Sequence, residues 1–329
     1  MRAATGVQYE LTAETPSGRA RAIITEVAAG LRSYALNGID LVETFPAEST
    51  PPMGAGIVLV PWPNRIRDGA WVENGVRQQL ALTEPARKNA IHGLLRFSPY
   101  RKVARADDSI TLGATVFPQS GYPFHLDTEV TYSLVADGLA VTHVVQNVGP
   151  TNAPVALGAH PYLKIGEVPT GELVLRIVAD THIDVDDRLN PIGETPVDGT
   201  RFDLRAGVRV ADLDLDDGFG AVTVTRVSTT GQDRPPCGEH SLTAPDGRTV
   251  TLWGDENMRY VQVYTPRDFP IHSDDSAHVA ARGQAIAIEP MTAPANAFNS
   301  GAGLRWLRPG EAWTVRWGIR HSGFDAWRA

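Results

Sequence analysis

The sequence predicts an all-β protein whose strands are mostly antiparallel. Short segments of β-branched and aromatic residues recur with a period near two, which is typical of strands. The 31 glycines and 24 prolines exceed average usage, and turn dipeptides such as Asn37-Gly38 and Asp246-Gly247 separate the apolar segments. Convincing amphipathic helices are hard to find. These observations favour many short strands in one large domain over residues 1–329.

Several segments fit the strand pattern, and turn signals bound them. In chain order they are Arg21–Val27, Gly138–Asn147, Glu172–Val178, Ala221–Val227, Thr249–Trp253, Tyr260–Tyr264, Ala285–Glu289 and Ala312–Ile319. Ser276–Arg282 fits one short helix. Asp184–Thr200 and Ser228–His240 are predicted to be loops, and the second loop is expected to hold Cys237 at the surface.

Charge and cysteine content restrict the possible functions. The chain has 30 basic and 38 acidic residues and a net charge of −8, which argues against nucleic acid or an anionic membrane as the main partner. The single cysteine, Cys237, cannot form an internal disulfide, which fits a reducing compartment. The first residues lack the apolar core of a signal peptide, and no segment has the roughly 18 apolar residues of a membrane-spanning helix. We therefore expect a cytoplasmic protein with no membrane partner.

The common cofactor and metal motifs do not occur in the sequence. There is no G-x-x-x-x-G-K-[ST] loop, G-x-S-x-G elbow, C-x-x-C or H-E-x-x-H. Gly54-Ala55-Gly56 begins like a dinucleotide fingerprint, but Leu59 stands where its third glycine belongs. One segment resembles a metal site, although an exposed acidic turn is the simpler interpretation: His272, Asp274, Asp275 and His278. We expect no cofactor and no metal.

Two histidines stand out by their context. His160 precedes a proline, which favours extended backbone and places the imidazole at the end of a strand. The alternative is a core histidine bonded to a carbonyl. His92 precedes Gly93, which permits a tight turn or the close approach of a ligand. The alternative there is a turn histidine exposed to water.

Glu289 is the most informative carboxylate. It ends an apolar strand, and alternation places it on the face of Ala285 and Ala287, opposite Ile286 and Ile288. These small neighbours are expected to leave room for a ligand. Desolvation beside the apolar strand should raise the pKa of Glu289, which suits proton transfer near neutral pH. The alternative is a strand-end glutamate in a salt bridge.

Three further polar residues are candidates for ligand binding. Asn64 and Arg65 follow a stiff segment of two prolines around Trp62, and a guanidinium held there can donate several hydrogen bonds to sugar or carboxylate oxygens. An interstrand ion pair is the alternative for Arg65, and an Asx turn is the alternative for Asp216. Together the candidates offer an acid, a base and polar contacts, which suits proton transfer on a polar small molecule.

At this point the sequence resembles the aldose 1-epimerases, or mutarotases, of the galactose mutarotase type. The motifs occur in the family's order over about residues 20–320, nearly the whole chain. The main matches are Pro61–Ile66 (PWPNRI), Asn89–Gly93 (NAIHG), Gly121–Phe124 with Val130–Leu134, Leu157–Tyr162 (LGAHPY) and Glu289–Asn299 (EPMTAPANAFN). Val261–Pro266 and Leu307–Glu311 are supporting matches.

The resemblance implies a large antiparallel β-sandwich with a sugar cleft on a concave face. It also implies that His160 is the general acid and Glu289 the general base, while Arg65 and His92 bind the sugar near its reactive end. Asp216, three positions before Phe219, matches a family aspartate that binds sugar hydroxyls, although Asp217 is an alternative for this role. No cofactor is needed for such a reaction.

The implied reaction needs an ionised Glu289 and a cationic His160. Their mutual attraction favours both charges and burial opposes them, and the sequence leaves this balance open. We expect a free aldohexose such as glucose or galactose to be the substrate, and either a monomer or a homodimer is compatible with the sequence.

Several positions depart from the family pattern. Trp62 replaces a common tyrosine and Met291 a frequent glutamine, whereas Arg96 and Lys164 add positive charge. If the two cations face the cleft, they suit an anionic sugar such as a hexose 6-phosphate or a sulfonated sugar, but solvated surface positions are the simpler interpretation. A non-catalytic sugar-binding module and a glycoside lyase or hydrolase are also compatible with the sequence.

Overall fold

Three antiparallel sheets make up most of the protein in a computed structural model, which describes residues 2–225, 228–229, 232–233, 237–272 and 281–324. Every pairing between the strands named in these residues is antiparallel. The N-terminal sheet has the order β1-β2-β3-β4 and consists of β1 (Gln8–Thr15), β2 (Gly18–Thr25), β3 (Leu31–Leu36) and β4 (Ile39–Asp40). It packs against β11 and β12 of the largest sheet.

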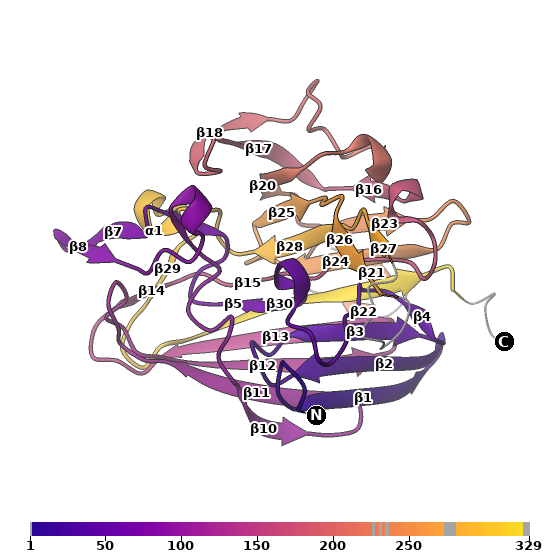
Figure 1. The fold of residues 1–329 in the computed structure, drawn as a ribbon, viewed down its shortest axis with the longest axis horizontal. Coiled ribbons are helices and arrows are strands. Elements are labelled where there is room, and N and C mark those ends of the chain that lie inside the picture. The colour runs from indigo at the N-terminus through magenta and orange to yellow at the C-terminus, as the bar shows by residue number, and fades with distance from the viewer. Residues whose placement is uncertain (1, 226–227, 230–231, 234–236, 273–280, 325–329) are drawn as a thin grey trace.

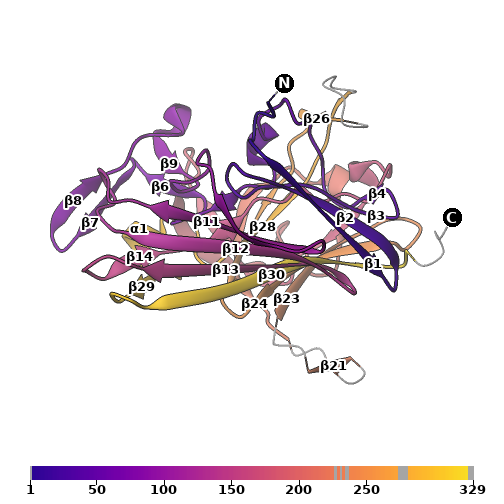
Figure 2. The same ribbon diagram turned by 90° about the horizontal axis from the view of Figure 1, so that it is seen from below.

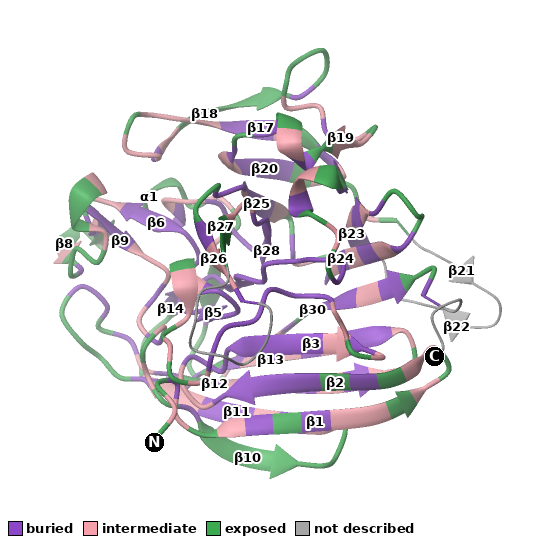
Figure 3. Cartoon of the chain, turned by 45° about the vertical axis from the view of Figure 1, so that its right-hand side comes forward, coloured by how far each residue is buried: buried purple, intermediate pink, exposed green. Residues whose placement is uncertain are grey.

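The largest sheet has nine strands (Figure 1). In spatial order they are β10 (Arg101–Arg105), β11 (Ser109–Val116), β12 (Leu126–Val135), β13 (Gly138–Asn147), β30 (Ala312–Ser322), β24 (Thr249–Asp255), β23 (Cys237–Thr243), β16 (Val174–Arg176) and β19 (Val208–Arg209). Burial alternates along β12 and β13, because successive side chains point to opposite faces. The edge strand β10 is exposed along its whole length (Figure 3).

A seven-stranded sheet carries two of the candidate residues, Asp216 and Glu289. Its order is β18 (Pro191–Pro196), β17 (Ala179–Val185), β20 (Asp216–Val222), β25 (Tyr260–Tyr264), β28 (Ala287–Met291), β15 (Gly158–Ala159) and β5 (Val58–Leu59). Two-stranded ribbons flank the sheets: β6 (Arg65–Arg67) with β9 (Asn89–Ile91), β7 (Ala70–Glu73) with β8 (Val76–Gln79), β14 (Ala153–Val155) with β29 (Arg305–Leu307), β21 (Ser228–Thr229) with β22 (Gln232–Asp233), and β26 (Phe269–Ile271) with β27 (Ala281–Gly283).

Helical structure in the described residues is confined to short pieces. They are α1 (Ala297–Ser300) and the 3₁₀ turns η1 (Pro52–Gly54), η2 (Pro85–Arg87), η3 (Thr170–Glu172) and η4 (Val210–Asp212). None of these helices is long and apolar enough to cross a membrane. The all-β prediction is therefore confirmed.

One hydrophobic core receives side chains from all three sheets. Tyr34 comes from the N-terminal sheet, Val130 and Ile319 from the nine-stranded sheet, and Val261 and Ile288 from the seven-stranded sheet. Burying each aliphatic side chain contributes about 1.5–3 kcal/mol, so this shared core holds the sheets together as a β-sandwich. Figure 2, seen from below, shows the long strands β12, β13 and β30 of the nine-stranded sheet running side by side.

Most of the predicted strands are present, and some have the predicted bounds. Gly138–Asn147 and Tyr260–Tyr264 coincide with β13 and β25. Ala221–Val227 was a poor prediction, because β20 ends at Val222 and residues 226–227 lie outside the described part. The predicted helix Ser276–Arg282 also lies largely outside it, and its last residues belong to strand β27.

Both loop predictions are wrong in part. Asp184–Thr200 contains β18, whose exposed, proline-bounded sequence shows no apolar alternation and which is ordered by pairing with β17. Ser228–His240 contains β21, β22 and the start of β23. Cys237 is buried rather than at the surface, because it begins β23 and pairs with Asp255 of β24.

Candidate active site

A cavity of about 600 Å³ opens between the seven-stranded sheet and the β6–β9 ribbon. Its lining brings together every candidate residue from the sequence: Asn64, Arg65, His92, His160, Asp216 and Glu289. These residues span more than two hundred positions of the chain. The fold therefore assembles them in one place, as the resemblance implied.

His160 and Glu289 meet at the floor of the cavity. Glu289 lies on β28, and His160 directly follows β15, which pairs with β28 through Gly158 and Met291. The distance from His160 Nε2 to Glu289 Oε1 is 3.3 Å, and the side chains are only 5% and 3% exposed. His160 Nδ1 and Glu289 Oε2 have no hydrogen-bond partner among the described residues. The pair is buried, close and incompletely bonded.

Burial dominates the electrostatics of this pair. Desolvation raises the pKa of Glu289 well above its usual value, and the nearby Asp216 carboxylate adds to the rise. Desolvation lowers the pKa of His160 to about 4, with a further contribution from the positive charge of Arg65. Both shifts favour the neutral forms of the two groups, so burial outweighs their mutual attraction. The expected rise in the pKa of Glu289 is confirmed.

Space for a ligand beside Glu289 does not come from the small residues of its strand. Ala285 and Ala287 are fully buried and pack in a cluster with Phe45, Tyr162 and Phe269. The prediction of room at these alanines is therefore wrong, because aromatic side chains from other segments fill that space. The cavity instead extends from Glu289 toward Asp216 and Arg65.

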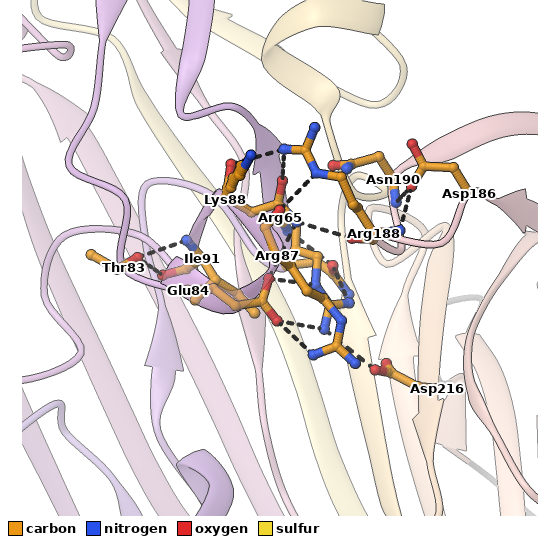
Figure 4. Close-up of polar contacts among 12 residues, drawn as sticks. Arg65, Thr83, Glu84, Arg87, Lys88, Ile91, Asp186, Arg188, Asn190 and Asp216 are labelled. Carbon is orange, nitrogen blue, oxygen red and sulfur yellow. Dashed lines mark hydrogen bonds and ion pairs between the residues drawn. The ribbon is translucent and has the colours of Figure 1, made fainter.

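Arg65 is held in position by several partners (Figure 4). Its guanidinium donates from Nε and Nη2 to the two carboxylate oxygens of Glu84, at 2.9 and 3.1 Å. Nη2 also donates to Asp216 Oδ2 at 3.3 Å, and Nη1 donates to Asn64 Oδ1 at 3.4 Å. Arg65 lines the cavity, as expected for a ligand-binding residue, and it also forms ion pairs. The two interpretations from the sequence are therefore compatible.

Aromatic packing fixes the segment that carries Arg65. Trp62 is buried against Phe298 and Tyr122, with ring centroids 5.4 and 6.5 Å apart. Such aromatic pairs favour defined relative orientations. The Trp62 departure from the family pattern thus lies in the support of the site and away from the cavity lining.

His92 lies at the side of the cavity, next to His160. It adopts a positive φ of 61°, and its ring makes an edge contact with the ring of His160 at 5.2 Å between centroids. Gly93 follows with a φ of 72°, and a Cβ there would lie 2.0 Å from the carbonyl oxygen of Val60. This glycine therefore lets the backbone approach closely and turns His92 into the cavity. Desolvation, together with the neighbouring His160, lowers the pKa of His92.

The geometry distinguishes Asp216 from Asp217. The two residues begin β20, so their side chains point to opposite faces. Asp216 lines the cavity and accepts a hydrogen bond from Gln262 at 2.8 Å. Asp217 Oδ1 lies 2.8 Å from Nε2 of the buried His182, on the other face of the strand. Asp216 is thus the aspartate that faces the cavity.

Sequence reasoning missed Glu84, Gln262 and Tyr264. All three are near the candidate residues: Glu84 and Tyr264 line the cavity, and Gln262 pairs with Glu289 across β25 and β28. The alternation of Tyr260–Tyr264 was a usable signal, because it puts Gln262 and Tyr264 on one face. Glu84 follows Leu80-Ala81-Leu82-Thr83, and nothing in this local sequence indicates an arginine partner.

Lys164 does not face this cavity and is not solvated either. It is 7% exposed and lies 3.4 Å from the buried carboxylate of Glu43, in a separate cavity of about 280 Å³. Both interpretations from the sequence are therefore wrong for Lys164, because residues distant in the sequence bury it with a counter-ion. Met291 is fully buried as well.

Potential metal ligands occur in two places. His92, His160 and Glu289 offer ligand atoms within 4.8 Å of one another. Metal-bound histidines usually donate their other ring N–H to an acceptor, yet Nδ1 of His92 and of His160 has no such partner in the described part. In the acidic segment 272–278, His272 is buried, whereas Asp274, Asp275 and His278 lie outside the described residues.

Known proteins are similar to this chain in sequence. The chain is 33% identical over 302 residues to the uncharacterized protein YihR of Escherichia coli (strain K12), a match that covers 91% of this chain and 90% of that protein. It is 32% identical over 154 residues to human galactose mutarotase, which covers 45% of this chain and 44% of the human protein.

Solved structures share the fold. A GalM/aldose epimerase homologue from C. elegans superposes with a TM-score of 0.78 at 19% identity, covering 96% of this chain and 99% of that chain. A putative aldose 1-epimerase from Escherichia coli K12 gives a TM-score of 0.75 at 18% identity, with coverage of 96% and 99%. The family model for aldose 1-epimerase matches residues 10–320. The chain therefore belongs to the aldose 1-epimerase family and is an isomerase of the mutarotase type.

Proposed function

We propose that the enzyme interconverts the α and β anomers of a free aldohexose such as glucose or galactose. The observation that carries this proposal is the buried contact of 3.3 Å between His160 and Glu289 at the floor of a polar cavity. Ring opening needs one group to take the proton of the anomeric hydroxyl and another to protonate the ring oxygen. Two adjacent titratable groups, each with one polar atom that has no partner in the described part of the chain, meet this requirement.

The reaction starts with Glu289 ionised and His160 cationic. Glu289 removes the proton of the anomeric hydroxyl, His160 gives its proton to the ring oxygen, the C1–O5 bond breaks and an aldehyde forms at C1. Rotation about the C1–C2 bond presents the other face of the aldehyde. Ring closure with the two proton transfers reversed then yields the other anomer. Each positioned proton transfer contributes roughly 10²–10⁴ in rate.

Burial favours the open-chain intermediate in this scheme. Ring opening converts the charged pair into neutral Glu289 and neutral His160, which are the forms that desolvation stabilises. Before ring opening, one proton must therefore move from neutral Glu289 to neutral His160. The sugar hydroxyls and the arranged dipoles of the cavity supply the polar surroundings for this transfer.

The cavity suits a neutral polyol better than an anion over most of its surface. Its lining has more carboxylates than guanidiniums: Glu84, Asp214, Asp216, Asp268 and Glu289 against Arg65, Arg87 and Arg267. Carboxylates accept hydrogen bonds from hydroxyl groups and repel anions. We infer that Asp216 binds sugar hydroxyls and that Arg65 and His92 bind near the anomeric centre, with Asn64 orienting Arg65.

Polarimetry on freshly dissolved α-D-glucose and α-D-galactose tests the proposal. The wild type should accelerate the decay of optical rotation, and the Glu289→Ala and His160→Ala variants should not. Asp217→Asn is a matched control, because Asp217 is a partly buried carboxylate beside the site that points away from the cavity. Acceleration that persists in both Ala variants would refute the assigned roles.

An anionic sugar is the second candidate, and Arg96 supports it. Arg96 lines a lobe of about 310 Å³ that shares Met53, Glu84, Ile91 and His92 with the main cavity. Its guanidinium donates to the carbonyl of Thr83 and makes no ion pair within the described residues. Because C6 of an aldohexose is two bonds from the ring oxygen that His160 protonates, a phosphate or sulfonate on C6 would lie near this lobe.

The substrate comparison separates these candidates. If the lobe binds an anion, Arg96→Gln should lower kcat/KM on glucose 6-phosphate by about tenfold or more, whereas kcat/KM on glucose should not change. Equal effects on both sugars would leave the neutral sugar as the substrate. A purely sugar-binding role is the least supported candidate, since binding alone gives no reason for the His160–Glu289 pair. A cytoplasmic location and a monomeric or homodimeric state remain predictions.

A further inference from the structure

We infer that Glu84 is a positioning residue of the reaction: it sets the direction of the Arg65 guanidinium and thereby the place of the sugar relative to Glu289. This inference rests on the proposed function. Glu84 lies on none of the named strands and directly precedes η2. Its carboxylate is largely buried, at 15% side-chain exposure, and lines the cavity beside Arg65.

The Glu84 carboxylate collects donors from three side chains. Arg65 donates to both oxygens, Arg87 donates to Oε1 at 3.2 Å, and Asn89 donates to Oε2 at 3.2 Å. Bidentate arginine–carboxylate pairs are strong and fix the plane of the guanidinium. Although burial opposes ionisation, these contacts hold the pKa of Glu84 below its usual value. Glu84 is thus a fixed negative charge behind Arg65.

The backbone of Glu84 is held as firmly as its side chain. Glu84 and Asn89 exchange two backbone hydrogen bonds, at 3.0 and 3.2 Å, around η2. Asn89 also begins β9, whose partner strand β6 begins with Arg65. The same short ribbon therefore carries Arg65 and anchors its counter-ion, so the relative position of the two groups has little freedom.

Arg188, which is distant in the sequence, stabilises this arrangement with hydrogen bonds (Figure 4). Its Nε donates to the carbonyl of Arg87 at 2.8 Å, and its Nη2 donates to Asp68 at 2.7 Å and to the carbonyl of Lys88 at 3.0 Å. The Arg188 carbonyl accepts a hydrogen bond from Asn89 Nδ2 at 3.0 Å. A continuous set of contacts thus runs from Arg188 through Asn89 and Glu84 to Arg65.

This arrangement decides which part of Arg65 meets the sugar. Glu84, Asp216 and Asn64 together occupy all the N–H groups of the guanidinium except one on Nη1. Without the Glu84 carboxylate, the nearest acidic partner of Arg65 is Asp216, at 3.3 Å. We expect the guanidinium then to turn toward Asp216, which would occupy two sugar-binding groups with each other.

Kinetics of Glu84→Gln and Glu84→Asp test the inference. The Gln variant keeps the size but loses the charge, and the Asp variant keeps the charge but shortens the reach. On α-D-glucose or α-D-galactose, whichever the wild type converts faster, we expect Glu84→Gln to raise KM about tenfold or more, with a smaller fall in kcat. Glu84→Asp should give an intermediate KM. Glu311→Gln is the matched control, because Glu311 also binds two arginines, Arg305 and Arg308, but lies outside the cavity.

A double-mutant cycle separates positioning from a general structural role. The double variant Arg65→Lys/Glu84→Gln should have a KM within about threefold of the KM of Arg65→Lys alone. The reason is that the group that Glu84 orients is already altered in Arg65→Lys. A rise in KM of the double variant equal to the product of the rises in the two single variants would overturn the inference. A wild-type KM in folded Glu84→Gln would also overturn it. If Glu84→Gln does not fold, Arg188→Gln provides the same test at the outer end of the contacts, with a smaller expected rise in KM.

Failure of the proposed function gives a different result. A wild type that mutarotates neither sugar refutes the proposed substrate, whatever Glu84 does. In that case the dissociation constants of D-glucose and D-galactose, measured by calorimetry for the wild type and Glu84→Gln, replace KM in the comparison. Unchanged affinity in the variant, or no binding of either sugar by the wild type, would then overturn the inference.

Discussion

The residues at the floor of the cavity and those of its arginine wall differ in how burial affects their ionisation. The floor, His160 and Glu289, has few hydrogen bonds, and burial favours its neutral forms. In the wall, Arg65 with Glu84 and Asp216, the side chains of Arg65 and Glu84 are also shielded from water, but their bidentate contact holds the pKa of Arg65 above and that of Glu84 below its usual value. Burial by itself therefore does not decide ionisation, and the number of partners does.

This difference matches the role that we propose for each region. Groups that exchange protons need two accessible protonation states, so a dense set of partners for one state would hinder them. Groups that bind a sugar need one fixed orientation, which many partners provide. The following changes are arranged from the largest expected effect to the smallest, and each alters one side of this comparison.

Glu289→Gln removes proton transfer at the floor and keeps its shape. We expect kcat for anomer interconversion to fall by about 10²–10⁴, because an amide cannot act as the base. At pH 7 the variant should be no less stable than the wild type, since the cost of burying a carboxylate is removed. Polarimetry and urea unfolding measure both effects. A large loss of stability would mean that Glu289 is ionised and well paired in the empty site.

His160→Gln changes how stability depends on pH. The pKa of His160 is about 4 in the folded protein and near 6.5 when unfolded, so the unfolded chain binds the extra proton as the pH falls below about 6.5. Through this residue, the free energy of unfolding of the wild type should fall by on the order of 1–3 kcal/mol between pH 6.5 and 4. The free energy of unfolding of the variant should fall less. Urea unfolding at several pH values provides the comparison. Parallel curves for the two proteins would show that His160 is readily protonated in the fold.

Asp216→Asn and Asp217→Asn form a pair that tests the wall. Asp216 contacts Arg65 and Gln262 in the cavity, so its variant should raise KM about tenfold with little change in kcat. Asp217 contacts His182 on the other face, so its variant should leave KM within about twofold and lower Tm. The reverse pattern would assign the sugar contact to Asp217.

Much of this protein follows from its sequence. Apolar alternation located β13 and β25 at their true bounds, and it correctly placed Glu289 on the face opposite Ile288. The prediction of one large domain stays a prediction, and the hydrophobic core shared by the three sheets supports it. Short motifs also singled out His160, His92 and Arg65, which all line the cavity, because prolines restrict the backbone beside His160 and Arg65 and Gly93 permits a tight turn after His92.

Other features depended on which distant segments meet. Cys237, Lys164 and β18 were misplaced because partners from elsewhere in the chain bury or order them. Glu84 was missed for the same reason, since its significance lies in its contact with Arg65. The ionisation of His160 and Glu289 is likewise a property of their burial together. The sequence determines local backbone preferences and the chemical types available, whereas desolvation and ion pairing depend on three-dimensional proximity, and only the tertiary structure decides them.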